Sequence, residues 1–178
     1  MSGVQRVIAG VDGSLGSLQA LRYAAEEARE RDALLVAIIA WLPPGGDLAE
    51  RRYPSVYLRQ IWRNAAWDRL LSAFDAGLGG FPPEVPVEPR VVRGEPGPVL
   101  VDSADDPSDL LVVGTGRRGL RRAMSRSVSR YCLAHAQCPV TAIPPSALME
   151  ETARGIHLWP LRHRALVPHL PDDWPGRA

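Results

Sequence analysis

Apolar residues in the first part of the chain follow two different spacings. A mostly apolar run at 4–11 ends in Asp12-Gly13-Ser14, and leucines and alanines then recur every three or four residues as far as residue 28. A second apolar run at 33–42 follows, and a Pro-Pro-Gly-Gly stretch ends it. Unbroken apolar runs are typical of strands covered on both faces, whereas the spacing of three to four predicts a helix. We therefore expect the chain to open with the β-α-β unit of a parallel sheet.

The same spacings predict three more strands and three more helices before residue 144. A broad apolar stripe from Pro54 predicts a long helix, which the glycines of 77–80 end. The run 85–92 contains Pro86 and Pro89, which cannot donate backbone hydrogen bonds, so this third strand is expected outermost in the sheet. The remaining predicted elements are a short helix at 98–104, a strand at 110–113, a helix at 127–136 and a fifth strand at 139–143.

Residues 146–178 have a different character. Proline, histidine, arginine and two tryptophans are scattered there without a helical or strand period. This pattern predicts an irregular C-terminal tail. With 178 residues in all, the chain has the length of one domain, which we place at 1–145, followed by the tail at 146–178.

Composition narrows the possible chemistry. The chain has 21 basic residues and no lysine, so a P-loop lysine, a Schiff base and a lysine nucleophile are all excluded. The formal net charge of +1 gives no general attraction to nucleic acid or to an anionic membrane. No run approaches the roughly 18 apolar residues of a membrane span, and the N-terminus lacks a signal-peptide pattern. With two cysteines and no disulfide framework, a cytoplasmic protein is expected.

Two candidate ligand-binding loops follow predicted strands. In open parallel α/β sheets, ligands bind at the carboxyl ends of the strands. Asp12 after the first strand has the position to bind a ribose hydroxyl or, through water, a metal; the alternative is a plain helix-capping turn. After the fourth strand, six arginines and no acidic residue occur between 117 and 130, beside glycines, Ser127 and Ser129. This composition favours phosphate binding, and its alternative is a solvated basic surface.

Metal binding and covalent catalysis are not expected. Cys132, His135 and Cys138 recur every third residue, but three ligands at one helix end without a fourth make a poor zinc site. No serine or aspartate stands in the sequence frame of an activated nucleophile.

Four segments in order carry a family resemblance. They are Val-Ile-Ala-Gly-Val-Asp-Gly-Ser at 7–14, Val-Val-Gly-Thr-Gly-Arg-Arg-Gly at 112–119, Ser-Val-Ser at 127–129 and His-Ala-Gln-Cys-Pro-Val at 135–140. Together they resemble a universal stress protein domain over residues 4–144. The resemblance implies an α/β fold of the Rossmann-like, adenine nucleotide alpha hydrolase-like type: a five-stranded parallel sheet in the order 3-2-1-4-5 with helices on both faces. It also implies ATP binding in one branch of the family and often a homodimer through the fifth strand.

The ATP-binding branch has the pattern Gly, two residues, Gly, nine residues, Gly, then Ser or Thr, and this chain departs from it. When the family pattern is aligned on Ser127, its first two glycines correspond to Gly114 and Gly116, with one intervening residue missing. Arg126 then stands in place of the third glycine. An alternative alignment uses Gly116 and Gly119 as the first two glycines, but it misaligns the serines. In the first register, the resemblance assigns nucleotide binding to Val11, Asp12, Ala40, Gly114, Gly116, Arg126, Ser127 and Val128.

The leading hypothesis is a cytoplasmic regulator of the stress response that binds ATP or a related adenine nucleotide, with or without Mg²⁺. The rival is an interaction module that binds no nucleotide and whose arginine-rich loop contacts an acidic protein partner. Enzymatic phosphoryl transfer ranks third, at most as weak ATP hydrolysis, because no further carboxylates accompany Asp12. We also expect a homodimer, because the short apolar fifth strand lies at a sheet edge.

Overall fold

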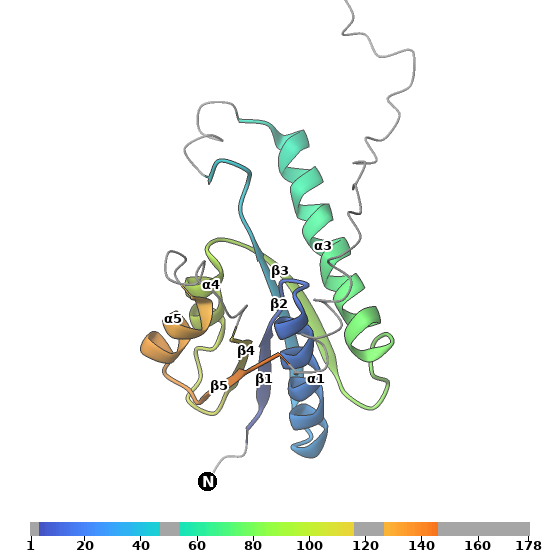
Figure 1. The fold of residues 1–178 in the computed structure, drawn as a ribbon, viewed down its shortest axis with the longest axis vertical. Coiled ribbons are helices and arrows are strands. Elements are labelled where there is room, and N and C mark those ends of the chain that lie inside the picture. Colours follow the sequence, from blue (N-terminus) through green and yellow to red (C-terminus); the bar gives the residue numbers. More distant parts are fainter. Residues whose placement is uncertain (1–3, 47–53, 116–126, 146–178) are drawn as a thin grey trace, which may run out of the picture.

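Five parallel strands form one sheet in the order β3-β2-β1-β4-β5 (Figure 1). The computed structural model describes residues 4–46, 54–115 and 127–145. Its strands are β1 (Arg6–Gly10), β2 (Leu34–Trp41), β3 (Val87–Arg93), β4 (Leu110–Gly114) and β5 (Val140–Ile143). Its helices are α1 (Leu15–Glu30), α3 (Val56–Leu78), α4 (Pro96–Ser103) and α5 (Val128–His135). The predicted fold class and strand order are confirmed, and β3, which contains Pro89 and directly follows Pro86, is an edge strand.

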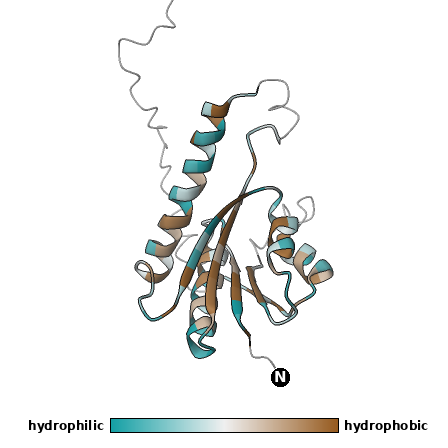
Figure 2. Cartoon of the chain, turned by 180° about the vertical axis from the view of Figure 1, so that it is seen from behind, coloured by the Kyte–Doolittle hydropathy of each residue, from teal (hydrophilic) through white to brown (hydrophobic). Residues whose placement is uncertain are grey.

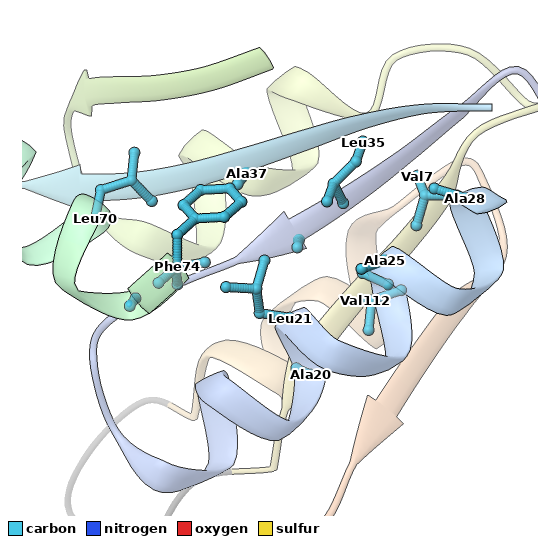
Figure 3. Close-up of a cluster of buried hydrophobic side chains, with 14 of the residues drawn as sticks. Val7, Ala20, Leu21, Ala25, Ala28, Leu35, Ala37, Leu70, Phe74 and Val112 are labelled. Carbon is cyan, nitrogen blue, oxygen red and sulfur yellow. The ribbon is translucent and has the colours of Figure 1, made fainter. Parts of the chain in front are cut away.

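Helices cover both faces of the sheet, so the central strands are mostly apolar, as Figure 2 shows. Alternate strand residues point to opposite faces. Val7, Leu35 and Val112 join α1 and α3 in one buried cluster, whereas Ile8 and Leu111 join α4 and α5 in the other. Figure 3 shows the first cluster, in which α1 and α3 point their leucines, alanines and Phe74 at β1, β2 and β4.

An ion pair at the amino edge of the sheet connects β1 to the turn before β4. Arg6 donates from Nε to Asp109 Oδ1 at 2.8 Å and from Nη2 to Asp109 Oδ2 at 2.6 Å, and the Asp109 side chain has no exposed surface. The same Nη2 also reaches the exposed Asp105 at 2.6 Å. These carboxylates raise the pKa of Arg6, and Arg6 lowers the pKa of Asp105. The sequence pattern did not predict this pair, because 103 residues separate its main partners.

The tail at 146–178 lies outside the described residues, so the division into domain and tail stays a prediction. Within the described part of the chain, no helix combines the length and apolar composition needed to cross a membrane.

Candidate functional site

A cleft lies at the carboxyl edge of the sheet, where the neighbouring strands β1 and β4 end. The described residues enclose a space of about 110 Å³ there. Its lining comes from the ends of β1, β2 and β4 and from the first turns of α1, α4 and α5. The lining residues are Gly10, Val11, Asp12, Ser14, Ser17, Ile38, Ala40, Pro96, Leu100, Val113, Gly114 and Val128. Apolar side chains dominate, and the polar side chains of the lining all belong to the turn that starts α1.

The turn at Asp12 holds its carboxylate at the cleft by a short chain of hydrogen bonds. The Ser14 N–H donates to Asp12 Oδ1 at 2.8 Å, and the Asp12 N–H donates to Ser17 Oγ at 3.2 Å. Ser14 is also the N-cap of α1, because its Oγ accepts from the Ser17 N–H at 3.3 Å. The capping turn that was the alternative reading is therefore present, and it fixes the Asp12 carboxylate beside the cleft.

Asp12 is ionised at neutral pH. Partial burial by itself raises the pKa of this carboxyl. The hydrogen bonds from Ser14 and Ser17 together lower the pKa by more than burial raises it, so the pKa lies below its ordinary value. A carboxylate oxygen accepts more than one hydrogen bond, so Asp12 retains capacity for a ligand hydroxyl.

Two glycines let the elements around the cleft approach closely. A Cβ on Gly114 would lie 2.7 Å from the backbone carbon and oxygen of Gly16 in α1. A Cβ on Gly10 would lie 2.7 Å from a methyl group of Leu100 in α4. Both glycines stand at the ends of strands, so the missing side chains bring α1 and α4 against the mouth of the cleft.

The first turn of α5 presents backbone N–H groups near the cleft. Val128, its first residue, lines the cleft. The preceding Ser127 is the N-cap but makes no capping hydrogen bond with its side chain; its hydroxyl pairs with the Ser129 hydroxyl at 2.8 Å. The first N–H groups of a helix have no partner within the helix, so this turn differs from the capped start of α1 and suits an anionic group.

The structure places most of the predicted site residues together. Five of them line the one cleft: Val11, Asp12, Ala40, Gly114 and Val128. Ser127 directly precedes Val128 in the sequence. Gly116 and Arg126, with most of the arginine block, lie outside the described residues. Their binding roles, and those of the residues in the cleft, remain predictions.

Sequence reasoning missed four apolar lining residues. Ile38 and Val113 lie inside buried strands, and Pro96 and Leu100 belong to a short helix that follows the edge strand β3. No local signal distinguishes them, because α4 reaches the cleft only by packing across β2 and β1.

The Cys-His-Cys spacing does not form a ligand cluster in the described structure. Cys132 and Cys138 are buried in the core beneath α4 and α5, while the exposed His135 ring stacks on Tyr131 with centroids 4.1 Å apart. Burial raises the pKa of both thiols, that of Cys132 to about 11. Among the described residues, no group of three histidine, cysteine or acidic side chains is arranged to hold a metal ion.

Comparison with known proteins identifies the family. The model of the universal stress protein family matches residues 3–144. The chain belongs to this family. A universal stress protein of Mycobacterium tuberculosis is 34% identical over 138 residues, which are 75% of this chain and 42% of that protein. A relative in Mycolicibacterium smegmatis is 31% identical over 145 residues, which are 78% of this chain and 45% of that protein. The chain thus spans less than half the length of these curated relatives.

Solved structures of universal stress proteins have the same fold. One, crystallised in complex with cAMP, is 28% identical, with a TM-score of 0.54, and the match covers 82% of this chain and all of the other. UspA from Lactobacillus plantarum has a TM-score of 0.56 at 22% identity, and the match covers 80% of this chain and 99% of that one. The second likeness shows the fold alone, whereas the first is close enough to inform the interpretation of the cleft.

Proposed function

We propose that this universal stress protein binds an adenine nucleotide in the cleft between the ends of β1 and β4. The observation that carries the proposal is the composition of the cleft: apolar walls, one fixed carboxylate and a helix start without a side-chain cap. These groups suit a purine, a ribose and a phosphate respectively. The related structure in complex with cAMP supports an adenine nucleotide over other ligands of similar chemistry.

Each part of the ligand has a stated partner. Ile38, Ala40 and Val113 provide apolar surface for the adenine ring. The ionised Asp12 accepts a hydrogen bond from a ribose hydroxyl, and the first N–H groups of α5, with the Ser127 hydroxyl, donate to phosphate oxygens. These partners surround a single cleft, so they act on one bound molecule.

We further propose that the nucleotide is ATP, and the effect of Arg126 on its phosphates determines whether ATP binds. A glycine beside phosphate serves by lacking a Cβ, so an arginine there either obstructs the phosphate or replaces lost donors with its guanidinium. If Arg126 obstructs, Arg126→Gly raises the affinity for ATP. If Arg126 donates, the same change weakens ATP by roughly 1.5 to 3 kcal/mol, the range for a hydrogen bond to a charged group. We expect obstruction, because the loop is also one residue short.

The proposed role is regulatory rather than catalytic, in the cytoplasm and as a homodimer through β5. Asp12 is the only carboxylate among the described residues that line the cleft. A Mg²⁺ ion brought by ATP would therefore rely mainly on phosphate oxygens, as Mg²⁺ commonly does. β5 pairs with β4 on one side, and on its other side none of the described strands pairs with it, which leaves that edge for a second copy.

The decisive experiment combines mass spectrometry of the gently purified full chain with calorimetry of adenosine, AMP, cAMP and ATP. Asp12→Ala is expected to weaken adenosine, AMP and ATP by the same factor, because these three share the same two free ribose hydroxyls, whereas cAMP has only the 2′ hydroxyl free. Ser127→Ala is expected to weaken ATP more than adenosine, by about 1 kcal/mol.

Asp106→Ala is the matched control for Asp12→Ala. Asp106 accepts the N–H of Ser108 at 2.8 Å in the same two-residue turn, but at the amino edge of the sheet before β4. This variant is expected to bind nucleotide like the wild type. Absence of binding to all four ligands in the wild type and in Arg126→Gly would refute the proposal and favour the interaction module with an acidic partner.

A further inference from the structure

The first turn of α1 contains a buried hydroxyl that the packing of this helix does not require. Ser17 is 4% exposed, whereas every other buried residue of α1 is glycine, alanine or leucine. Alanine has the shape of serine without the oxygen, and it is the better helix former. A buried hydroxyl costs free energy unless it is hydrogen-bonded, so the bonds of Ser17 indicate why a serine occupies this position.

The hydroxyl of Ser17 forms its hydrogen bonds within the turn before α1. Its Oγ donates to the carbonyl of Ser14 at 2.9 Å and accepts the N–H of Asp12 at 3.2 Å. A serine hydroxyl has a single hydrogen to donate, and the carbonyl of Ser14 takes it. Although Ser17 lines the cleft, it therefore has no hydrogen left to donate to a bound phosphate.

This turn differs from an ordinary capping box in a way that involves Asp12. In a capping box, the side chain three residues after the N-cap reaches back to the N–H of the N-cap residue. Here the Asp12 carboxylate accepts that N–H, from the N-cap Ser14 at 2.8 Å. Ser17, three residues after the N-cap, reaches two residues further back, to the N–H of Asp12. Asp12 is therefore held at its carboxylate by one serine and at its backbone by the other.

Ser17 also holds the turn where the hydrogen bonding of β1 to its neighbour ends. The N–H of Val11 still donates to the carbonyl of Ile38 in β2 at 2.8 Å, and the next N–H, that of Asp12, donates to Ser17. The end of β4 lies against the same residue, because a Cβ on Gly114 would be 2.9 Å from the Ser17 nitrogen. Ser17 thus fixes Asp12 relative to both strands that border the cleft.

We infer that Ser17 is a positioning residue of the nucleotide site, whose hydroxyl directs the Asp12 carboxylate toward the ribose. This role rests on the proposed nucleotide binding, which assigns the ribose to Asp12. Removing the hydroxyl leaves the buried side of the turn with an N–H that has lost its partner, and such a donor turns toward water. The turn then relaxes, and the carboxylate leaves the orientation in which it accepts a ribose hydroxyl.

Two measurements on the full chain without ligand test the effect of Ser17 on Asp12. Ser17→Ala is expected to speed hydrogen exchange of the Asp12 amide about tenfold, because its hydrogen bond is lost. Burial raises the pKa of Asp12 while hydrogen bonds from Ser14 and Ser17 lower it, so this variant is expected to raise that pKa in an NMR titration. Ser103→Ala is the matched control, because it removes a helical hydroxyl that donates to Val99 in α4 at 2.7 Å, and neither quantity should change.

Calorimetry of the full chain tests whether Ser17 acts on the ligand through the ribose. AMP has both ribose hydroxyls, and 2′,3′-dideoxy-AMP has neither. Ser17→Ala is expected to weaken AMP about fivefold and to leave the affinity for dideoxy-AMP unchanged. In an Asp12→Ala background, Ser17→Ala is expected to cause no further loss, because the two residues act as one unit. Ser17→Cys, whose thiol forms weaker hydrogen bonds, is expected to bind AMP with an affinity between those of the wild type and Ser17→Ala.

Three results would overturn the inference. The first is an Asp12 amide and an Asp12 pKa that both stay at their wild-type values in Ser17→Ala. The second is an equal loss of affinity for AMP and for dideoxy-AMP, and the third is an equal loss with and without the Asp12 carboxylate; both would mean that the variant disturbs the whole cleft. If the wild type binds no AMP, the proposed function fails instead, and the exchange and titration results alone then support or overturn the role of Ser17.

Discussion

Replacing Gly114 by alanine tests how closely β4 and α1 must pack. The added Cβ would lie 2.7 Å from the carbonyl carbon and oxygen of Gly16 and 2.9 Å from the nitrogen of Ser17. Ordinary contact begins near 3.4 Å, so the two elements must separate by about 0.7 Å, the difference between 3.4 and 2.7. The contacts are all to backbone atoms, so no side-chain rotation relieves the clash.

The expected cost of Gly114→Ala is about 1–3 kcal/mol, the usual range for overpacking a core. For a chain of this size, each kcal/mol lowers the melting temperature by about 2–4 °C, so a fall of about 2–12 °C is expected. Thermal unfolding followed by circular dichroism, with urea titration at 25 °C, measures both quantities. Because Gly114 and Ser17 both line the cleft, the same displacement also widens the proposed nucleotide site.

Gly77→Ala is the control for this experiment. A Cβ on Gly77 would meet its nearest neighbour, a methyl group of Leu21, at 3.5 Å, which is an ordinary contact. Alanine is also the better helix former, so this variant should be as stable as the wild type or more stable by up to about 1 kcal/mol. Gly114→Ala melting within 1 °C of the wild type would refute the reasoning, because it would mean that β4 and α1 separate without cost.

Two further predictions concern buried ionisable groups. Arg6→Ala leaves the buried Asp109 without its bidentate partner and should destabilise the fold by about 2–3 kcal/mol in urea, whereas Asp105→Ala, at an exposed partner, should change little. If instead both changes have equal effects, the Asp109 pair is not what holds β1 to the turn before β4. The Cys132 pKa is raised from its ordinary 9.0 to about 11 by burial, so the contribution of this thiol to stability should be constant well below pH 9 and fall by about 2 kcal/mol between pH 9 and 11. Urea unfolding at pH 8 and pH 10.5 should show this extra fall in the wild type and not in Cys132→Ser; parallel losses would contradict it.

The helices and strands of this protein could be predicted from the sequence because they depend on local pattern. Apolar runs of strand length and stripes at helical spacing gave the β and α elements in their observed order. Ser14 as an N-cap and the prolines of the third strand marked a helix start and a sheet edge. These signals are short-range, since backbone geometry and hydrogen-bonding capacity belong to the residues themselves.

The strand order and the grouping of the site residues came from the resemblance to universal stress proteins, because local pattern does not contain them. It implied the strand order 3-2-1-4-5 and named residues at the ends of three different strands as one site. The structure brings Val11, Asp12, Ala40, Gly114 and Val128 to the same cleft. Continuous apolar strands indicate a parallel sheet but do not say which strands are neighbours.

Only the tertiary structure revealed the contacts between distant segments. Arg6 and Asp109 meet across 103 residues of sequence, and Leu100 reaches the cleft because Gly10 leaves room for it. Gly114 matches a phosphate-binding pattern in the sequence, yet in the structure its missing Cβ is already required by the backbone of Gly16. Such contacts depend on how helices pack across the sheet, and packing is decided by the whole set of buried side chains rather than by any one segment.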